Sequence, residues 1–222
     1  HFRRPLALRL RWDERRHRRR RNAVFIGMSY NLICMDCAFR YALVAYVNDP
    51  VEEFIRTIRQ ELHPNLPHLA AHLSFLPPRC LQDVESSAER LIEEVCSSVE
   101  AFEVSLGEVE TFIPGTPTVF IRVAHSAARM RELHRLLNRG ALASQEEWPY
   151  LPHLTIVKMG TEEEAQEAYR IARRRWAEFA ASRVILVSDL TFVREEGPNQ
   201  WRDLARIPLG RPLAKNQIAV TS

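Results

Sequence analysis

The sequence predicts an α+β fold made of two halves that face each other across a central cleft. The predicted strands and helices follow an order that folds back on itself, with one histidine-bearing strand between helices in each half. These two strands carry the motifs His72-Leu73-Ser74 and His153-Leu154-Thr155, while the halves share little other identity. Helices with one apolar stripe cover the outer faces of such sheets. An approximate two-fold axis between the halves would bring the two histidines to one cleft.

The first half begins with an apolar, β-prone run that predicts a strand over 41–47. We expect Asp49 to cap the helix that follows, with Pro50 at its first position. The apolar stripe of this helix has 3.6-residue spacing and consists of Phe54, Ile55, Ile58 and Leu62. The first histidine strand is predicted over 69–76. Pro77-Pro78 is expected to end it, because proline lacks the N–H group that a strand donates.

The remaining periodic segments complete the predicted fold. Helices are expected over 81–101, from Ser126 onward, and after Thr161, which forms a capping box with Glu164. Strands are predicted over 103–113, 117–124, 152–159, 183–194 and 201–208. Turn residues at 114–117 and 197–199 separate strands that follow each other directly.

The two histidine strands are expected to present the same pair of polar groups to the cleft. Side chains alternate between the faces of a strand, so His153 and Thr155 point one way and the leucine between them points the other. The same alternation puts His72 and Ser74 on one face of the earlier strand. Two imidazoles and two hydroxyls would therefore meet in one space.

Phosphodiester cleavage is the chemistry that uses such a set. With pKa values near 6.5, one neutral histidine can remove a proton from water while the other, protonated, donates to the leaving oxygen. Hydroxyl groups can donate hydrogen bonds to the non-bridging phosphate oxygens and stabilise the charge of the transition state. These groups supply what a metal ion otherwise would, so we expect neither a metal nor a cofactor.

The paired motifs resemble those of the 2H phosphoesterase superfamily, within it the 2′-5′ RNA ligase and cyclic phosphodiesterase-like branch. Its signature is two His-x-Ser/Thr motifs, and Pro152 and Lys158 beside the second motif also resemble the family pattern. The closing pattern is similar too, with Leu186-Val187-Ser188, Gly197, Trp201, Leu204 and Pro208-Leu209. Two residues depart from it, since Ser74 stands where threonine is commoner and Trp201 where tyrosine is often found.

The resemblance implies a bilobal fold in which two antiparallel sheets line the cleft. It implies cleavage of 2′,3′-cyclic phosphates on RNA ends or small nucleotides to 2′-phosphates, with 2′-5′ ligation as the possible reverse reaction. By residue, His72 and His153 would be the acid–base pair, and Ser74 and Thr155 the phosphate ligands. Two alternatives stay open. One is a binding module for RNA ends or cyclic nucleotides, and the other a 2H enzyme for another cyclic phosphate or a 2′-5′ oligonucleotide.

Four further side chains are candidate substrate ligands. Arg122 alternates onto the cleft face of its strand and could bind phosphate or form a salt bridge at the rim. Arg79 and Lys158 are candidates for the same two roles. Tyr150, in a loop with Trp148, could stack on a base or pack against the core. His68 and His72 have the i, i+4 spacing of a helical zinc site, but the β-like run there disfavours that reading.

Composition restricts the domain organisation and the partners. The first 22 residues hold ten arginines, so the net charge of +3 hides an acidic remainder with no broad nucleic-acid surface. We expect residues 1–39 to be a disordered basic extension or sequence upstream of a start at Met28 or Met35. Residues 40–211 would form the phosphoesterase-like domain, and 212–222 a tail. We expect a monomer.

The cysteines and apolar runs bear on the compartment. Four dispersed cysteines in a chain of this length do not suggest a disulfide scaffold, and we take Cys34 and Cys37 as incidental thiols. A reducing, cytoplasmic location fits that pattern. Basic residues precede an apolar run at 23–28, but Asn31 and Asp36 interrupt it, so we do not expect a signal peptide. No run reaches the roughly 20 apolar residues that cross a bilayer, so we expect no membrane partner.

Overall fold

The structure is a computed structural model that describes residues 37–64 and 69–210. All of these described residues belong to one compact unit. The expected tail at 212–222, most of the basic extension and His68 lie outside the described residues, as do Cys34 and the two alternative start sites.

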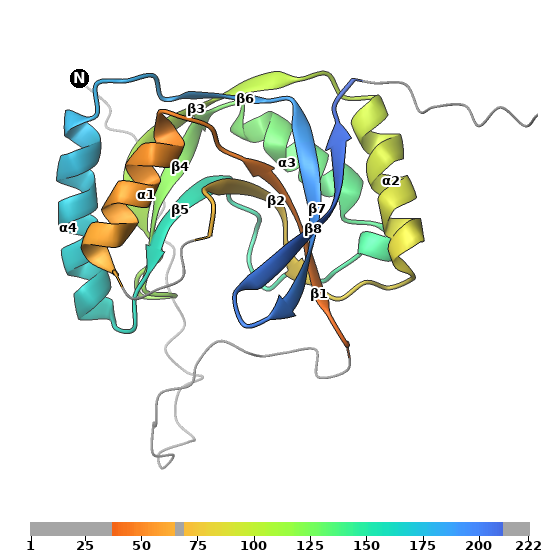
Figure 1. Cartoon of the computed structure of the whole chain (residues 1–222), viewed down its shortest axis with the longest axis horizontal. Helices are drawn as coiled ribbons and strands as arrows, with labels where there is room; N and C mark the ends of the chain where they lie inside the picture. The colour runs from red at the N-terminus through yellow and green to blue at the C-terminus, as the bar shows by residue number, and fades with distance from the viewer. Residues whose placement is uncertain (1–36, 65–68, 211–222) are drawn as a thin grey trace, which may run out of the picture. The chain divides into compact units, whose positions relative to one another are not determined.

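Eight strands form one antiparallel sheet in the order β6-β3-β4-β5-β2-β1-β7-β8. Their bounds are β1 Arg40–Tyr46, β2 His72–Arg79, β3 Phe102–Thr111, β4 Thr118–His125, β5 His153–Lys158, β6 Val184–Val187, β7 Asp189–Gly197 and β8 Gln200–Pro208. Figure 1 shows that the sheet is curled, with helices on its outer side. The predicted α+β class is therefore confirmed.

The two expected sheets are the two ends of this one sheet. One end contains β6-β3-β4-β5 and the other β2-β1-β7-β8, and only the pair Leu73↔Leu154 joins them across β2 and β5. Each end combines strands from both halves of the sequence, because β4 pairs with β5 and β7 pairs with β1. The two histidine strands therefore lie side by side in the middle of the sheet.

Helices cover the outer face of the sheet, and two of them pack on a strand from the other half of the sequence. Their bounds are α1 Val51–Leu62, α2 Glu85–Ser97, α3 Ala127–Leu137 and α4 Glu162–Glu178. Helix α1 follows β1 but packs on β5, and α3 follows β4 but packs on β2. Helices α1 and α4 lie together on one side of the molecule and α2 on the other (Figure 1). Between helices and sheet lies a core with fully buried Leu43, Phe75, Ile121 and Trp176, which leaves the inner face open for a site.

The predicted start of α1 is wrong in detail. Pro50 itself is the N-cap residue, and no side chain caps the helix. The backbone carbonyl of Asn48 accepts from the N–H of Glu52 instead, so the turn before the helix supplies what a capping side chain would. The capping box of Thr161 and Glu164 is confirmed at the start of α4, where both reciprocal bonds are present.

Two predicted strand ends are also wrong. Strand β2 continues through Pro77 and Pro78 to Arg79, because the register with β1 shifts at this point and the missing N–H groups fall in the irregularity. The strand predicted over 183–194 is two strands, broken at Ser188. β6 pairs with β3 at one end of the sheet and β7 with β1 at the other, so the chain crosses between the ends there.

The expectation of unpaired thiols is wrong for two cysteines. Cys37 and Cys80 form a disulfide that joins the segment before β1 to the residue after β2, with Cα atoms 5.8 Å apart. Disulfides persist in oxidising surroundings, so this pair does not support the reducing compartment inferred from cysteine spacing. Cys96 is a buried free thiol, and burial raises its pKa to about 12. None of the helices in the described residues is long and apolar enough to span a bilayer.

Candidate active site

The register between β2 and β5 brings the two histidine motifs together. Leu73 and Leu154 pair across the strands, and both are fully buried toward the helices. Their neighbours along each strand therefore point to the opposite, inner face. Because the strands are antiparallel, the residue before one leucine lies across from the residue after the other. The four polar groups thus form a block on the inner face, with His72 across from Thr155 and Ser74 across from His153.

Both imidazoles are oriented by the same local hydrogen bond. Nδ1 of His72 lies 2.8 Å from the carbonyl oxygen of Ala70, and Nδ1 of His153 lies 2.7 Å from that of Leu151. A carbonyl oxygen can only accept, so Nδ1 carries the hydrogen in each ring. Nε2 of each ring is then the nitrogen that can take up or release a proton at the inner face.

Burial and neighbouring cations favour the neutral form of both rings. Loss of hydration lowers the pKa of His72 below its ordinary value, and the charges of Arg59 and Lys158 lower it further. Burial likewise lowers the pKa of His153, with additional effects of Lys158 and of His72 itself. A bound phosphate anion would act in the opposite direction and favour the protonated form of one ring.

A β-bulge follows each histidine motif. In β5, successive residues of β4 pair with Thr155 and Val157, so Ile156 is an extra residue. Both Ile156 and Val157 are buried, and the alternation resumes one position later. Lys158 therefore lies on the inner face with the histidine, whereas simple alternation from Thr155 would put it among the helices.

The same irregularity occurs in β2. Successive residues of β1 pair with Ser74 and Leu76, so Phe75 is the extra residue. The two strands have the same burial pattern over their first five positions, partly exposed at the histidine and the hydroxyl residue and buried elsewhere. After the bulge, Pro77 takes the position in β2 that Lys158 takes in β5.

Lys158 differs from the arginines that share the inner face with it. Arg122 pairs with Glu110 at 2.7 Å, and Arg40 forms an ion pair with Glu195. Within the described part of the chain, no carboxylate lies at ion-pairing distance from Lys158. Its pKa is lowered by loss of hydration and by the charge of Arg40. Lys158 is thus available to an anion, while the two arginines have carboxylate partners.

Aromatic residues that sequence reasoning missed surround His153. The edges of Phe112 and Phe120 approach its ring, with centroids 5.2 and 5.1 Å away. The two phenylalanines stack on each other at 4.1 Å. They restrict the ring to one orientation. The alternation of Phe120 with buried valine and isoleucine in β4 was the signal that could have identified it.

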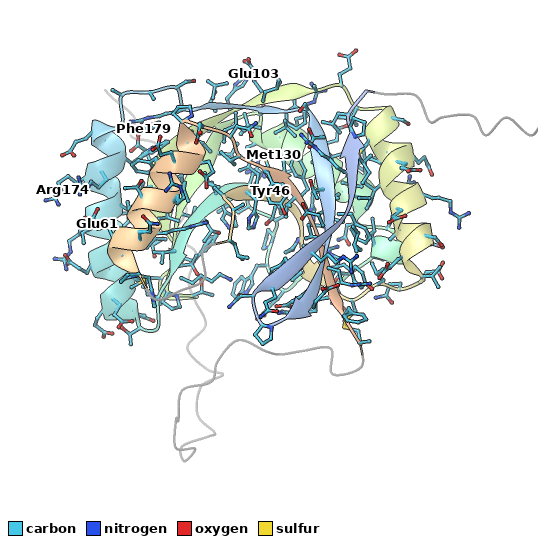
Figure 2. The ribbon with its side chains drawn as sticks, in the orientation of Figure 1. Tyr46, Glu61, Glu103, Met130, Arg174 and Phe179 are labelled. Atoms are coloured by element: carbon cyan, nitrogen blue, oxygen red, sulfur yellow. A yellow bond between two sulfur atoms is a disulfide. The ribbon has the colours of Figure 1, made fainter. Side chains whose placement is uncertain are left out.

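The surroundings of His72 are different. Tyr46 pairs with His72 across β1 and β2, and Figure 2 shows Tyr46 in the middle of the molecule, between the helices of the two sides. Its hydroxyl donates to Asp203 at 2.6 Å, and burial together with this carboxylate raises its pKa. Tyr46 and Trp201 pack on a small apolar cluster made of Ala42, Val44 and Val193. The inner face beside His72 is therefore apolar and aromatic.

Two predicted substrate ligands have other roles in the structure. The guanidinium of Arg79 is buried and donates to Asn138 at 2.8 Å, to the carbonyl of Leu142 at 3.0 Å and to Glu146 at 2.6 Å. Its Nε also donates to the carbonyl of Pro77 at 3.0 Å, so each of its three nitrogens has an acceptor within the protein and it does not fit a phosphate-binding role. The second register shift in β2 turns it toward the helices, which alternation alone could not reveal.

Tyr150 is the other residue whose expected role does not fit. Its ring stacks on His134 at 4.1 Å, and its hydroxyl donates to the carbonyl of Ser74 at 2.7 Å. Tyr150 contacts β2 from the side of helix α3 and is not placed to stack on a base. Trp148 is exposed, and Arg122 lies opposite His153 on the inner face. In the described residues no three His, Cys, Asp or Glu side chains are grouped to hold a metal ion.

Comparison with known proteins identifies relatives of this chain. Residues 47–199 match the family model described as the 2′-5′ RNA ligase superfamily. A bacterial protein of Halalkalibacterium halodurans, provisionally described as a phosphoesterase, is 24% identical over 117 residues, which are 52% of this chain and 68% of that protein. A second such protein, of Oceanobacillus iheyensis, is 23% identical over 54% of this chain and 70% of its own.

Solved structures agree on the fold. E. coli LigT complexed with 3′-AMP superposes with a TM-score of 0.53 and 16% identity, over 77% of this chain and 98% of that one. The protein TT0787 of Thermus thermophilus gives a TM-score of 0.53, 16% identity and the same coverage. Sequence identity this low supports a shared fold and carries no conclusion about the substrate.

Proposed function

This chain belongs to the 2′-5′ RNA ligase superfamily, and from that premise we propose that it hydrolyses 2′,3′-cyclic phosphates to 2′-phosphates. The observation that carries the proposal is the pairing of Leu73 with Leu154, which puts two imidazoles and two hydroxyls on one face of the sheet. Membership of the family supports a phosphoesterase of the 2H type. The cyclic phosphate as the substrate is our proposal.

The two histidines divide the proton transfers between them. Nε2 of the neutral ring removes a proton from water, and the water oxygen forms a bond to phosphorus. The bond between phosphorus and the 3′ oxygen breaks, and the protonated ring gives its Nε2 proton to that oxygen. The product is a 2′-phosphate, and the two rings have exchanged protonation states. Each such proton transfer contributes on the order of 10²–10⁴ in rate.

Three donors can hold the non-bridging oxygens of the phosphate. The hydroxyls of Ser74 and Thr155 each lie across from the histidine of the other strand, so a phosphorus atom between the rings is within reach of both. Lys158 adds a positive charge that needs no carboxylate to be displaced. Donors aimed at developing negative charge stabilise the transition state more than the substrate.

Small substrates fit the inner face better than long RNA. Binding of a nucleic-acid backbone depends on cations that are free to neutralise successive phosphates. Here Arg40 and Arg122 are paired with Glu195 and Glu110, which leaves little net charge along that path. The apolar surface near Tyr46 and Trp201 can accept the nucleoside part of a mononucleotide. We therefore propose a cyclic mononucleotide or a short RNA end as the substrate.

Turnover of a 2′,3′-cyclic mononucleotide by the purified chain in EDTA tests the function directly. We expect hydrolysis with the 2′-phosphate as the product, which phosphorus NMR distinguishes from the 3′-phosphate. Tight binding of the cyclic nucleotide without any product would instead support a binding module. Turnover restricted to ADP-ribose 1″,2″-cyclic phosphate or a 2′-5′ oligoadenylate would support the other phosphate esters. Ligation is tested in the same assay by supplying an RNA 5′-hydroxyl as the acceptor in place of water.

A further inference from the structure

One arginine contacts strand β5 and the segment that leads into β2. Arg59, on α1, donates through Nε to the carbonyl of Ile156 at 2.8 Å and through Nη2 to that of Thr155 at 2.8 Å. Through Nη1 it also donates to the carbonyl of Leu69, just before β2. The guanidinium therefore connects the bulge of β5 to the lead-in of β2.

These contacts occur where the sheet itself is weakest. Only the pair Leu73↔Leu154 is formed between β2 and β5, whereas the other neighbouring strands share four or more pairs. A single pair does not fix the distance and angle between two strands. The separation of His72 and His153 therefore depends on contacts outside the ladder, and Arg59 supplies such contacts to β5 and to the segment just before β2.

The carbonyls that Arg59 binds belong to the catalytic segments. Thr155 is a proposed phosphate ligand, and the carbonyl of Ile156 is in the bulge that turns Lys158 to the inner face. Leu69 is adjacent to Ala70, whose carbonyl orients the ring of His72. A shift of this guanidinium would thus move the histidine of one strand and the phosphate-binding residues of the other.

The opposite bulge has a different support, which shows what is special about Arg59. The carbonyls of Ser74 and Phe75 are bound by the hydroxyl of Tyr150 and by Nδ1 of His134, each at 2.7 Å. His134 is on α3, in the place that α1 occupies in the other half, and its Nε2 lies 3.2 Å from Glu146. Within the described residues, Tyr150 and His134 bind carbonyls of β2 and none of β5, whereas Arg59 connects β5 with the lead-in of β2.

We propose that Arg59 is a positioning residue that sets the separation of the two catalytic histidines and holds the bulge that presents Lys158. The proposal rests on the proposed function, since it assigns those residues their roles. An arginine suits this position because its planar fork binds several carbonyls in fixed directions at once. Its charge also lowers the pKa of His72, which links the same side chain to the proton transfer.

Substitutions of Arg59 in the full chain test this, with Arg56 as a matched control. Arg56 is on the same helix, is exposed, and has its nearest carboxylates at 3.7 Å. We expect Arg59→Met to reduce kcat about 100-fold, as for a displacement of roughly 1 Å at reacting groups, and to raise KM through Lys158. The kcat of Arg59→Lys should lie between those of the wild type and Arg59→Met, because an ammonium cannot bind three carbonyls in one plane. Arg56→Met should stay within about twofold of the wild type.

The pH profile separates positioning from general loss of structure. Arg59→Met removes a charge near His72, so the limb of the kcat/KM profile that belongs to this ring should move to higher pH. Arg59→Lys retains the charge, so its limb should stay while its kcat falls. A kcat for both variants within twofold of the wild type would overturn the proposal. So would equal loss of kcat and thermal stability without any change in the pH profile.

Nitrogen NMR of the two imidazoles makes the test independent of turnover. If the wild-type chain cleaves no cyclic phosphate, the proposed function fails, but the ring signals still report on Arg59. We expect Arg59→Met to raise the pKa of His72 and to change the environment of both rings, and Arg56→Met to change neither. Unaltered signals for both rings in Arg59→Met would show that this guanidinium does not position them. If Arg59→Met fails to fold, Arg59→Lys takes its place, and we expect it to change the environment of both rings while the pKa of His72 stays the same.

Discussion

The strands β2 and β5 have the same design up to the bulge and differ after it. Each presents a histidine and a hydroxyl residue to the inner face, and each then has two consecutive buried residues. Five positions after the histidine, β2 has Pro77 and β5 has Lys158. In the mechanism that we propose, the repeated part carries the two proton transfers, one for each ring. The part that differs would decide on which side of the site the phosphate binds.

The residues that flank the two histidine strands also differ. Across from His72 is Tyr46, beside an apolar cluster, and across from His153 is Arg122, beside two phenylalanines. Among these neighbours the β5 side has the charge of Lys158, which has no carboxylate partner in the described residues, and the β2 side has an apolar surface. A mononucleotide has the matching polarity, with a phosphate at one end and a base at the other. The comparison predicts that its phosphate lies toward Lys158 and its base toward Tyr46.

Removal of either histidine is expected to have the largest effect. His72→Ala and His153→Ala should each reduce kcat by about 10²–10⁴, since each removes one of two proton transfers. Both should cost a similar factor if the repeated part is functionally equivalent. His125→Ala is the control, because His125 is an exposed residue at the end of β4. Rates of cyclic-nucleotide hydrolysis near that of the wild type in either variant would contradict the paired roles.

The dependence of kcat/KM on pH is the next largest effect. The active form has one proton shared between the two rings, so its population is highest between their two apparent pKa values. Burial and cations lower the pKa of both rings, so the maximum should lie below about 6.5. Above it the rate should fall about tenfold for each pH unit, as the acid loses its proton. A maximum above pH 7 in the free enzyme would contradict this reading.

Local patterns in the sequence predicted the part of the site that the two strands share. Alternation was enough to put His153 and Thr155 on one face, and the capping box before α4 was visible in four residues. Contacts between distant segments could not be predicted from such local patterns. The bulge that turns Lys158 inward appears only in the pairing with β4, and the three carbonyls around Arg59 come from two other segments.

Arg79 also shows that local patterns do not predict contacts between distant segments. Its type and position near a histidine strand favoured phosphate binding, but the side chains opposite it decide its role. Asn138 and Glu146 are more than fifty positions away, and they take up its donors. The pairing of Cys37 with Cys80 was missed for the same reason, because spacing along the chain does not show which thiols meet.

The difference between Lys158 and Pro77 can be tested directly, with a smaller expected effect. Lys158→Met should raise KM for a cyclic nucleotide about tenfold, because it removes a charge that faces the phosphate without a carboxylate partner. It should also move the kcat/KM maximum to higher pH, since Lys158 lowers the pKa of both histidines. Pro77→Ala, at the equivalent position, should leave KM within about twofold. Equal changes in the two variants would mean that the β5 side has no special part in phosphate binding.

The disulfide is the last difference between the two strands, and it is expected to affect stability without affecting activity. It ties the end of β2 through Cys80, 43 positions from Cys37, while no disulfide ties the end of β5 in the described residues. A cross-link over such a loop typically contributes about 2–4 kcal/mol to folding. Cys37→Ser should lower the melting temperature, with kcat and KM within twofold of the wild type, because Cys80 follows the end of β2 and Cys37 precedes β1, outside the residues proposed for the proton transfers. Cys96→Ser, at a buried thiol without a disulfide, is the comparison for loss of a sulfur alone. A large fall in kcat for Cys37→Ser would mean that the end of β2 helps to hold His72 in place, and that the two strands differ in their catalytic half as well.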